Sequence, residues 1–84
     1  MKYFALIYRD DEHYIAYIPD YPYLKIRGAS LNEAHSNARF TLDVFINTRG
    51  SKKVKPRTLG ELECHIREFT ESVGSCLIVE LDIK

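Results

Sequence analysis

The residues of this chain that could support catalysis are its carboxylates, histidines and cysteines, and their spacing decides which chemistry is available. Two-metal hydrolysis needs several carboxylates that converge from different elements, because the two cations must stabilise both the attacking and the leaving oxygen. The chain has one acidic run, Asp10-Asp11-Glu12, and its last apolar stretch contains the alternating acidic residues Glu80 and Asp82. The residues between Lys2 and Arg9 are all apolar or tyrosine and add no carboxylate. The sequence therefore predicts no metal-dependent catalytic centre.

The histidines and cysteines do not form a recognisable site either. His13, His35 and His65 are scattered over a predicted hairpin and two predicted helices, so none is placed to activate a nucleophile. Cys64-His65 with Cys76 matches no standard zinc spacing and lacks a fourth ligand. The two cysteines could form a disulfide, but nothing marks the chain as secreted, and we expect reduced thiols. We expect no enzymatic activity, no cofactor and no metal.

Charge is balanced overall but unevenly distributed. The chain has twelve basic and twelve acidic residues, and Thr58–Lys84 has two basic residues against six acidic ones. Five cations lie within nine residues: Arg49, Lys52, Lys53, Lys55 and Arg57. This block predicts either a solvated loop or a segment that contacts nucleic-acid phosphates. The absence of an aromatic residue inside it, which could stack on a base, favours the loop.

Length and composition indicate one soluble globular domain over residues 1–84. The chain is 45% hydrophobic and 29% charged, which is too apolar for a disordered segment. Its longest apolar run is far too short to span a bilayer, and no signal-peptide pattern is present. We therefore expect a cytoplasmic protein with no membrane association.

Local patterns predict six elements. Apolar and aromatic runs bounded by polar or proline residues predict strands at Tyr3–Arg9, Tyr14–Ile18 and Leu24–Arg27, the last one closed by Gly28. Two capping boxes, Ser30 with Glu33 and Thr58 with Glu61, each precede apolar residues spaced three and four apart. They predict one helix that runs to about Thr48 and ends near Gly50, and a second that ends at Gly74. Cys76–Ile83 predicts a final strand.

The order β-β-β-α-α-β predicts an α+β fold with both helices on one face of a mostly antiparallel sheet. Because a strand that follows a helical crossover usually pairs in parallel with an earlier strand, we expect the last strand to lie parallel to the first. The first strand is apolar on both faces, which leaves one apolar face uncovered. That face predicts a homodimer interface or a partner surface, or else tyrosines that half-cover it with their hydroxyls in water. Phe40 and Val44 either widen the buried arc of the first helix or contact a second subunit.

Several motifs together resemble the N-terminal domain of the HicB antitoxin family. They are Met1–Tyr8 followed by an acidic turn, Pro19-Asp20-x-Pro22, Leu31-x-Glu33-Ala34-x-x-Asn37-Ala38 with Leu42, and Val79–Ile83. The resemblance implies a degenerate ribonuclease-H-like fold and a non-catalytic protein that binds and masks a small HicA-like toxin, a basic protein that cleaves messenger RNA. Because the chain stops after the predicted last strand, we expect no C-terminal DNA-binding module of the kind that full antitoxins commonly have.

The resulting hypothesis is an antitoxin-type binding protein that forms a homodimer or a higher homo-oligomer. The residues expected to contact the partner are acidic residues and tyrosines: Asp10, Asp11, Glu12, Tyr14, Tyr17, Asp20, Tyr21 and Tyr23. One alternative is a nucleic-acid-binding module that uses the five cations of the basic block. Another is an orphan domain whose toxin has been lost.

Overall fold

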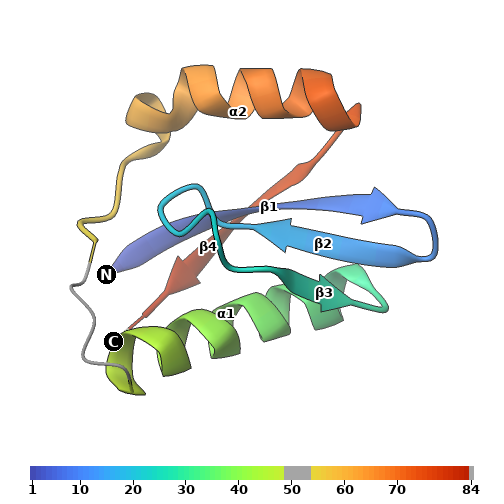
Figure 1. Ribbon diagram of the computed structural model, residues 1–84. Coiled ribbons are helices and arrows are strands. Elements are labelled where there is room, and N and C mark those ends of the chain that lie inside the picture. The colour runs from blue at the N-terminus through green and yellow to red at the C-terminus, as the bar shows by residue number, and fades with distance from the viewer. Residues whose placement is uncertain (49–53, 84) are drawn as a thin grey trace.

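The computed structural model describes residues 1–48 and 54–83, and Figure 1 shows a sheet with one helix on each side. The elements are β1 (Lys2–Asp10), β2 (His13–Tyr17), β3 (Ile26–Gly28), α1 (Leu31–Thr48), α2 (Leu59–Val73) and β4 (Leu77–Asp82). The predicted α+β class and element order are confirmed. The expected end of the first helix near Gly50 lies outside the described residues, as do Arg49, Lys52 and Lys53 of the basic block.

The sheet has the strand order β3-β2-β1-β4, and every neighbouring pair is antiparallel. The predicted parallel pairing of the last strand with the first is therefore wrong, since Tyr3 of β1 lies opposite Leu81 of β4 in an antiparallel register. The reason is that two helices, not one, separate β3 from β4. The two helices run in opposite directions along the sheet, so the chain reverses direction three times after β3: into α1, from α1 to α2, and into β4 (Figure 1). Because β3 runs parallel to β1, this odd number of reversals makes β4 antiparallel to β1.

Helix α1 packs on the face formed by Tyr3, Ala5 and Ile7 of β1, and this side contains the main hydrophobic core. Small residues let the helix approach the sheet closely. A Cβ on Gly28 would lie 2.4 Å from the backbone nitrogen of Ala34, so glycine is required at the end of β3 for this packing. The first turn of α1 is capped by Ser30, whose Oγ accepts a hydrogen bond from the Glu33 N–H at 3.1 Å.

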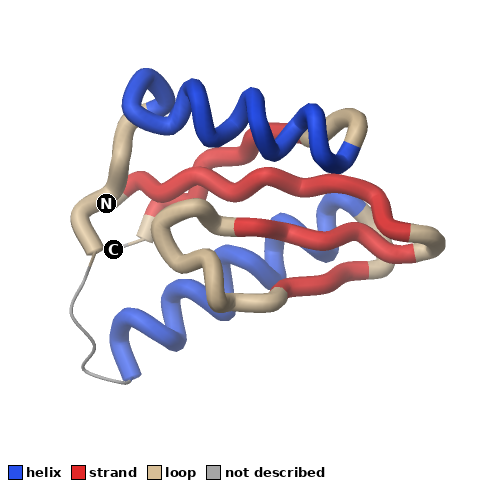
Figure 2. Tube along the Cα trace, turned by 45° about the horizontal axis from the view of Figure 1, so that its top comes forward, coloured by secondary structure: helices blue, strands red, loops and turns tan. Residues whose placement is uncertain are grey.

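Helix α2 covers the opposite face of the sheet, so the prediction that both helices lie on one face is wrong (Figure 2). The alternation of β1 turns Leu6 away from the α1 core, and Leu6 is buried on the side where α2 places its own buried residue, Leu62. Thr58 and Glu61 form the predicted capping box at the start of α2. The apolar face that was expected to be free for a second copy is thus covered by the chain's own second helix.

The structure also bears on the predictions for the outer face of α1, the two cysteines and membrane association. Phe40 is 70% exposed and Val44 is also exposed, so neither widens the buried arc of α1. Cys64 and Cys76 are free thiols rather than a disulfide pair. None of the helices within the described residues is long and apolar enough to cross a membrane.

Candidate interaction surface

The acidic run forms the exposed turn of the β1–β2 hairpin. Asp10 pairs with His13 in the ladder, which leaves Asp11 and Glu12 as the two turn residues. Asp11 has a φ of 55°, in the left-handed region that aspartate tolerates better than most residues. Arg9 Nε donates a hydrogen bond to the Asp11 carbonyl at 3.0 Å, which helps to hold this conformation. The turn therefore presents three exposed carboxylates at one end of the sheet.

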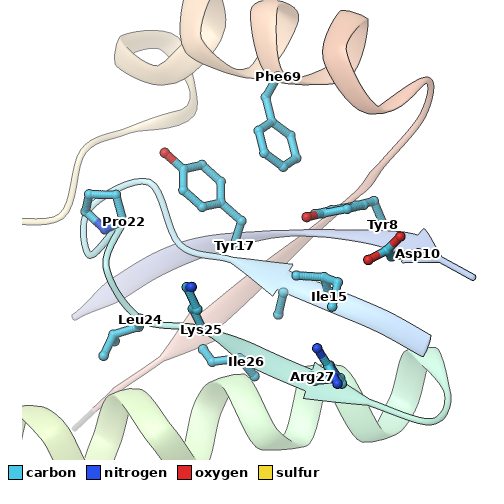
Figure 3. Close-up of a pocket in the computed structure, with 11 residues that line it drawn as sticks. Tyr8, Asp10, Ile15, Tyr17, Pro22, Leu24, Lys25, Ile26, Arg27 and Phe69 are labelled. Atoms are coloured by element: carbon cyan, nitrogen blue, oxygen red, sulfur yellow. The ribbon is translucent and has the colours of Figure 1, made fainter.

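A cleft of about 400 Å³ begins at this turn and runs between the sheet and α2 (Figure 3). Asp10 lies at one end of the cleft, and Pro22 and Leu24 lie at the other. The register places Tyr8, Ile15 and Arg27 side by side on three neighbouring strands, so their side chains share the face below α2. Lys25, two residues before Arg27, also lines the cleft. The cleft thus combines an aromatic and apolar floor with one acidic end and two cations along the β3 side.

A stack of rings attaches α2 to the sheet at this cleft. Tyr17 of β2 stacks on Phe69 with ring centroids 4.7 Å apart and on His65 with centroids 5.6 Å apart. Phe69 also meets Tyr8 edge to face, at 5.4 Å. The Tyr17 hydroxyl lies 2.9 Å from His65 Nε2, within hydrogen-bonding distance. Burial raises the pKa of the Tyr17 hydroxyl, and Arg57 partly opposes the shift.

Asp20 and Tyr21 lie inside the fold and anchor the segment that leads into α2. The Asp20 side chain is 2% exposed, and its carboxylate accepts hydrogen bonds from Arg57 Nε at 2.6 Å and from the Arg57 backbone N–H at 3.2 Å. The Tyr21 hydroxyl accepts from the Val54 N–H at 2.9 Å, and the Tyr3 hydroxyl donates to the Val54 carbonyl at 2.5 Å. Burial, reinforced by Tyr21, raises the pKa of the Tyr3 hydroxyl.

The residues predicted to bind a partner therefore occupy different environments. Asp10, Asp11 and Glu12 are exposed at the hairpin turn, whereas Tyr17 is half-buried in the ring stack. Tyr14 is half-buried and packs against the α1 core, on the face away from the cleft. Tyr23 is exposed, with its ring 5.8 Å from that of Phe45 of α1, and Asp20 and Tyr21 are buried. The structure brings the acidic turn and Tyr17 to one cleft but does not gather the whole predicted set.

The described cations of the basic block also lie in different environments. Arg57 is bound to Asp20, whereas Lys55 is exposed. Sequence reasoning missed Lys25 and Arg27, which have no ion-pair partner among the described residues. The alternation of Leu24-Lys25-Ile26-Arg27 was a signal that both cations share one face of the sheet.

The remaining titratable residues do not converge. Glu80 forms an ion pair with Lys2 at 3.5 Å, and Asp82 lies 3.9 Å from the N-terminal amine of Met1. Nowhere in residues 1–48 and 54–83 do three histidine, cysteine or acidic side chains gather in a way that could hold a metal ion. The best-formed surface feature is therefore the acidic turn with its adjoining aromatic cleft.

Solved structures that share this fold include three related to HicB antitoxins. The whole chain matches the crystal structure of the antitoxin HicB from Burkholderia pseudomallei with a TM-score of 0.81 and 18% identity, and it spans 62% of that protein. It matches the crystal structure of the N-terminal domain of that antitoxin with a TM-score of 0.79 and 18% identity, covering 99% of that chain. It also matches a chain of the HicA3 and HicB3 toxin–antitoxin complex over 99% of that chain, with a TM-score of 0.66 and 16% identity.

No protein-family model matches the sequence, and no curated protein matches it. The structural matches nevertheless cover 100% of this chain in every case. The fold is that of a HicB N-terminal domain, although the sequence is only 16–18% identical to those of the matching structures.

Proposed function

We propose that this chain is a non-catalytic antitoxin-type protein that binds and neutralises a small HicA-like toxin. The observation that supports this most directly is the likeness of the whole chain to a chain of the HicA3 and HicB3 toxin–antitoxin complex. The two other similar structures are those of a HicB antitoxin and of its N-terminal domain. Because such a toxin acts on messenger RNA, the proposal places the complex in the cytoplasm.

The proposed contact surface is the hairpin turn and the adjoining mouth of the cleft. Asp10, Asp11 and Glu12 project three negative charges from one short turn, which suits a basic partner and would accelerate the encounter with it. Tyr8 and Phe69 line the cleft beside them and supply aromatic surface of the kind that dominates binding energy at protein interfaces. On this proposal the buried Asp20 and Tyr21 support the surface from inside the fold.

The carboxylates of β4 support a binding role over a catalytic one. Glu80 and Asp82 face Lys2 and the terminal amine at the edge of the sheet, so they neutralise nearby cations there. They stand apart from the acidic turn, because Asp82 lies opposite Lys2 at the start of β1, whereas Asp10 is the last residue of that strand. A two-metal site would need such groups to converge.

The test is a pull-down of the tagged chain from its native lysate, with and without nuclease treatment, and mass spectrometry of the retained material. We expect one small basic protein that stays bound after nuclease treatment. A variant with Asp10→Asn, Asp11→Asn and Glu12→Gln should bind it roughly 5- to 150-fold less tightly, since three rim charges contribute roughly 1–3 kcal/mol together.

The matched control removes three exposed charges from α2 instead, as Glu63→Gln, Glu68→Gln and Glu71→Gln. Equal retention by the two triple variants would contradict the proposed surface. Recovery of nucleic acid alone, lost on nuclease treatment, would contradict the proposed function and favour the basic block. Recovery of no specific partner would favour the orphan domain.

A further inference from the structure

Two cations line the cleft on its β3 side, and neither is neutralised within the described part of the chain. Lys25 and Arg27 are both exposed and have no ion-pair partner among residues 1–48 and 54–83. Figure 3 shows both side chains rising from the β3 segment towards the cleft. Their Cα atoms are no more than about 7 Å apart, because only one residue separates them. Two cations at this spacing can bind one doubly charged group, such as a phosphate monoester.

The β1 side of the cleft is acidic. Asp10 lines the cleft there as the last residue of β1. The register pairs Asp10 with His13 and Arg27 with Ile15, so Asp10 and Arg27 are two strands and two residues apart. This separates their Cα atoms by about 12 Å. Because a carboxylate repels a bare anion, a ligand must keep its negative charge at the β3 side and present hydrogen-bond donors to Asp10.

Between these two charged sides the cleft is apolar and aromatic. Tyr8 and Ile15 contribute half-buried side chains from the sheet, and Phe69 of α2 meets the Tyr8 ring edge to face. The cleft volume of about 400 Å³ lies within the range of roughly 300–1,000 Å³ that is usual for small-molecule sites. Such sites combine an apolar lining with a few polar groups that fix the orientation of the ligand. A flat aromatic ring fits this lining, since aromatic pairs gain more than the area that they bury.

We propose that this cleft binds a guanine mononucleotide. The phosphate lies on Lys25 and Arg27, and the base lies beside Tyr8 and Phe69. Guanine presents two adjacent donors, its N1–H and its exocyclic amino group, which match the two acceptor oxygens of the Asp10 carboxylate. The separation of Asp10 from Arg27 corresponds to the length of a nucleotide from the edge of its base to its phosphate. The proposal goes beyond the function proposed above and does not depend on it.

Other ligands use only part of the cleft. Inorganic phosphate reaches the two cations but leaves the aromatic lining in water. Adenine lacks the pair of adjacent donors, and an aromatic acid has no donor for Asp10. An RNA strand carries the same groups, but its further phosphates would approach the three carboxylates of the acidic turn, Asp10, Asp11 and Glu12, which repel them. A free mononucleotide is therefore the ligand that the charges of the cleft favour.

The test is a titration of the purified chain with guanosine monophosphate, followed by NMR through the backbone amide signals. We expect saturable shifts at Tyr8, Ile15 and Arg27. The affinity should exceed that for guanosine or for inorganic phosphate at least about tenfold, and that for adenosine monophosphate about fivefold, because each charge-assisted contact contributes a factor of this order. Absence of saturable binding would overturn the proposal, as would equal affinity for inorganic phosphate. A single-stranded RNA bound more tightly than the mononucleotide would also overturn it and make nucleic acid the ligand.

Single-site variants assign the two charged sides. Arg27→Gln should weaken the binding of guanosine monophosphate about tenfold, whereas Asp10→Asn should remove the preference for guanine over adenine. The matched controls are Arg39→Gln and Asp43→Asn, at exposed positions of α1 on the other side of the sheet, and they should change neither quantity. Circular dichroism should be unchanged in all four variants. Wild-type affinity in Arg27→Gln would overturn the proposal. These titrations contain no toxin, so their failure is distinguishable from failure of the proposed function.

Discussion

Replacing Asp20 by alanine should destabilise the fold far more than removing any exposed acidic residue. The Asp20 carboxylate is 2% exposed and accepts two hydrogen bonds from Arg57, whereas the Arg57 side chain is 41% exposed. Breaking a fully buried ion pair by deleting one partner costs about 3–5 kcal/mol. Because the Arg57 guanidinium is partly in water and can be rehydrated, we reduce this to about 2–3 kcal/mol.

This loss is large for a domain of 84 residues, whose total stability is roughly 4–13 kcal/mol at about 0.05–0.15 kcal/mol per residue. It corresponds to a decrease in Tm of roughly 10–20 °C. The assay is urea unfolding of wild type, Asp20→Ala, Arg57→Ala and the double variant, which together form a double-mutant cycle. The expected coupling free energy between Asp20 and Arg57 is about 2 kcal/mol.

The ion pair between Glu63 and Arg67 provides the matched control for this cycle. Its atoms are 3.5 Å apart and its side chains are 71% and 65% exposed, so its coupling should not exceed about 0.5 kcal/mol. If the two cycles give the same coupling free energy, the reasoning that burial makes the Asp20 pair strong is refuted. If Asp20→Ala unfolds the chain completely, Asp20→Asn retains one acceptor and allows the comparison to be made.

Three further predictions concern the packing of the two helices and the buried hydroxyls. Gly28→Ala should lower the free energy of unfolding by about 2–3 kcal/mol in urea titrations, since its new methyl group would collide with the Ala34 backbone; no loss would show that α1 shifts freely. Tyr17→Phe keeps the ring stack and loses only the hydroxyl contact with His65, so it should lower the free energy of unfolding by about 0.5–1.5 kcal/mol in urea titrations. Tyr17→Ala, which also removes the ring, should lower it by more. Burial raises the pKa of the Tyr3 hydroxyl, so the folded state favours the protonated form; this stabilisation is complete below the unfolded-state pKa of about 10 and is lost as the pH rises through the folded-state pKa. Thermal unfolding from neutral to strongly alkaline pH should therefore show a steeper loss of stability in wild type than in Tyr3→Phe, and parallel curves would contradict the assignment.

Local signals in the sequence were sufficient to predict the elements, because caps and strand breaks act over a few residues. Thr58 and Glu61 form the predicted capping box, and Gly74 ends α2 with a φ of 94°. The strand pairing and the placement of the helices could not be predicted from local signals alone. The apolar residues on both faces of β1 show that both faces are covered, but they do not distinguish a second helix from a second copy.

The candidate surface was only partly predictable for a similar reason. Tyr21 and Tyr23 are two residues apart in sequence, yet one is buried and the other exposed. The difference comes from consecutive turns, in which the Tyr21 N–H bonds to the Ile18 carbonyl and the Leu24 N–H bonds to the Tyr21 carbonyl. The partner of Asp20 is likewise distant in sequence, and no local pattern links it to Arg57.

The pairing of β1 with β4 has a consequence for how the protein is made. These are the first and last strands of the chain, yet they are neighbours in the sheet and are linked in both directions between Met1 and Ile83. During synthesis, the edge of β1 that pairs with β4 therefore stays unpaired until Leu77–Asp82 has also emerged. Contacts between such distant segments slow folding, and an unpaired apolar strand is a site of aggregation in the meantime. The nascent chain should accordingly depend on chaperones until β4 has left the ribosome, and removal of β4 should leave β1 permanently open to association.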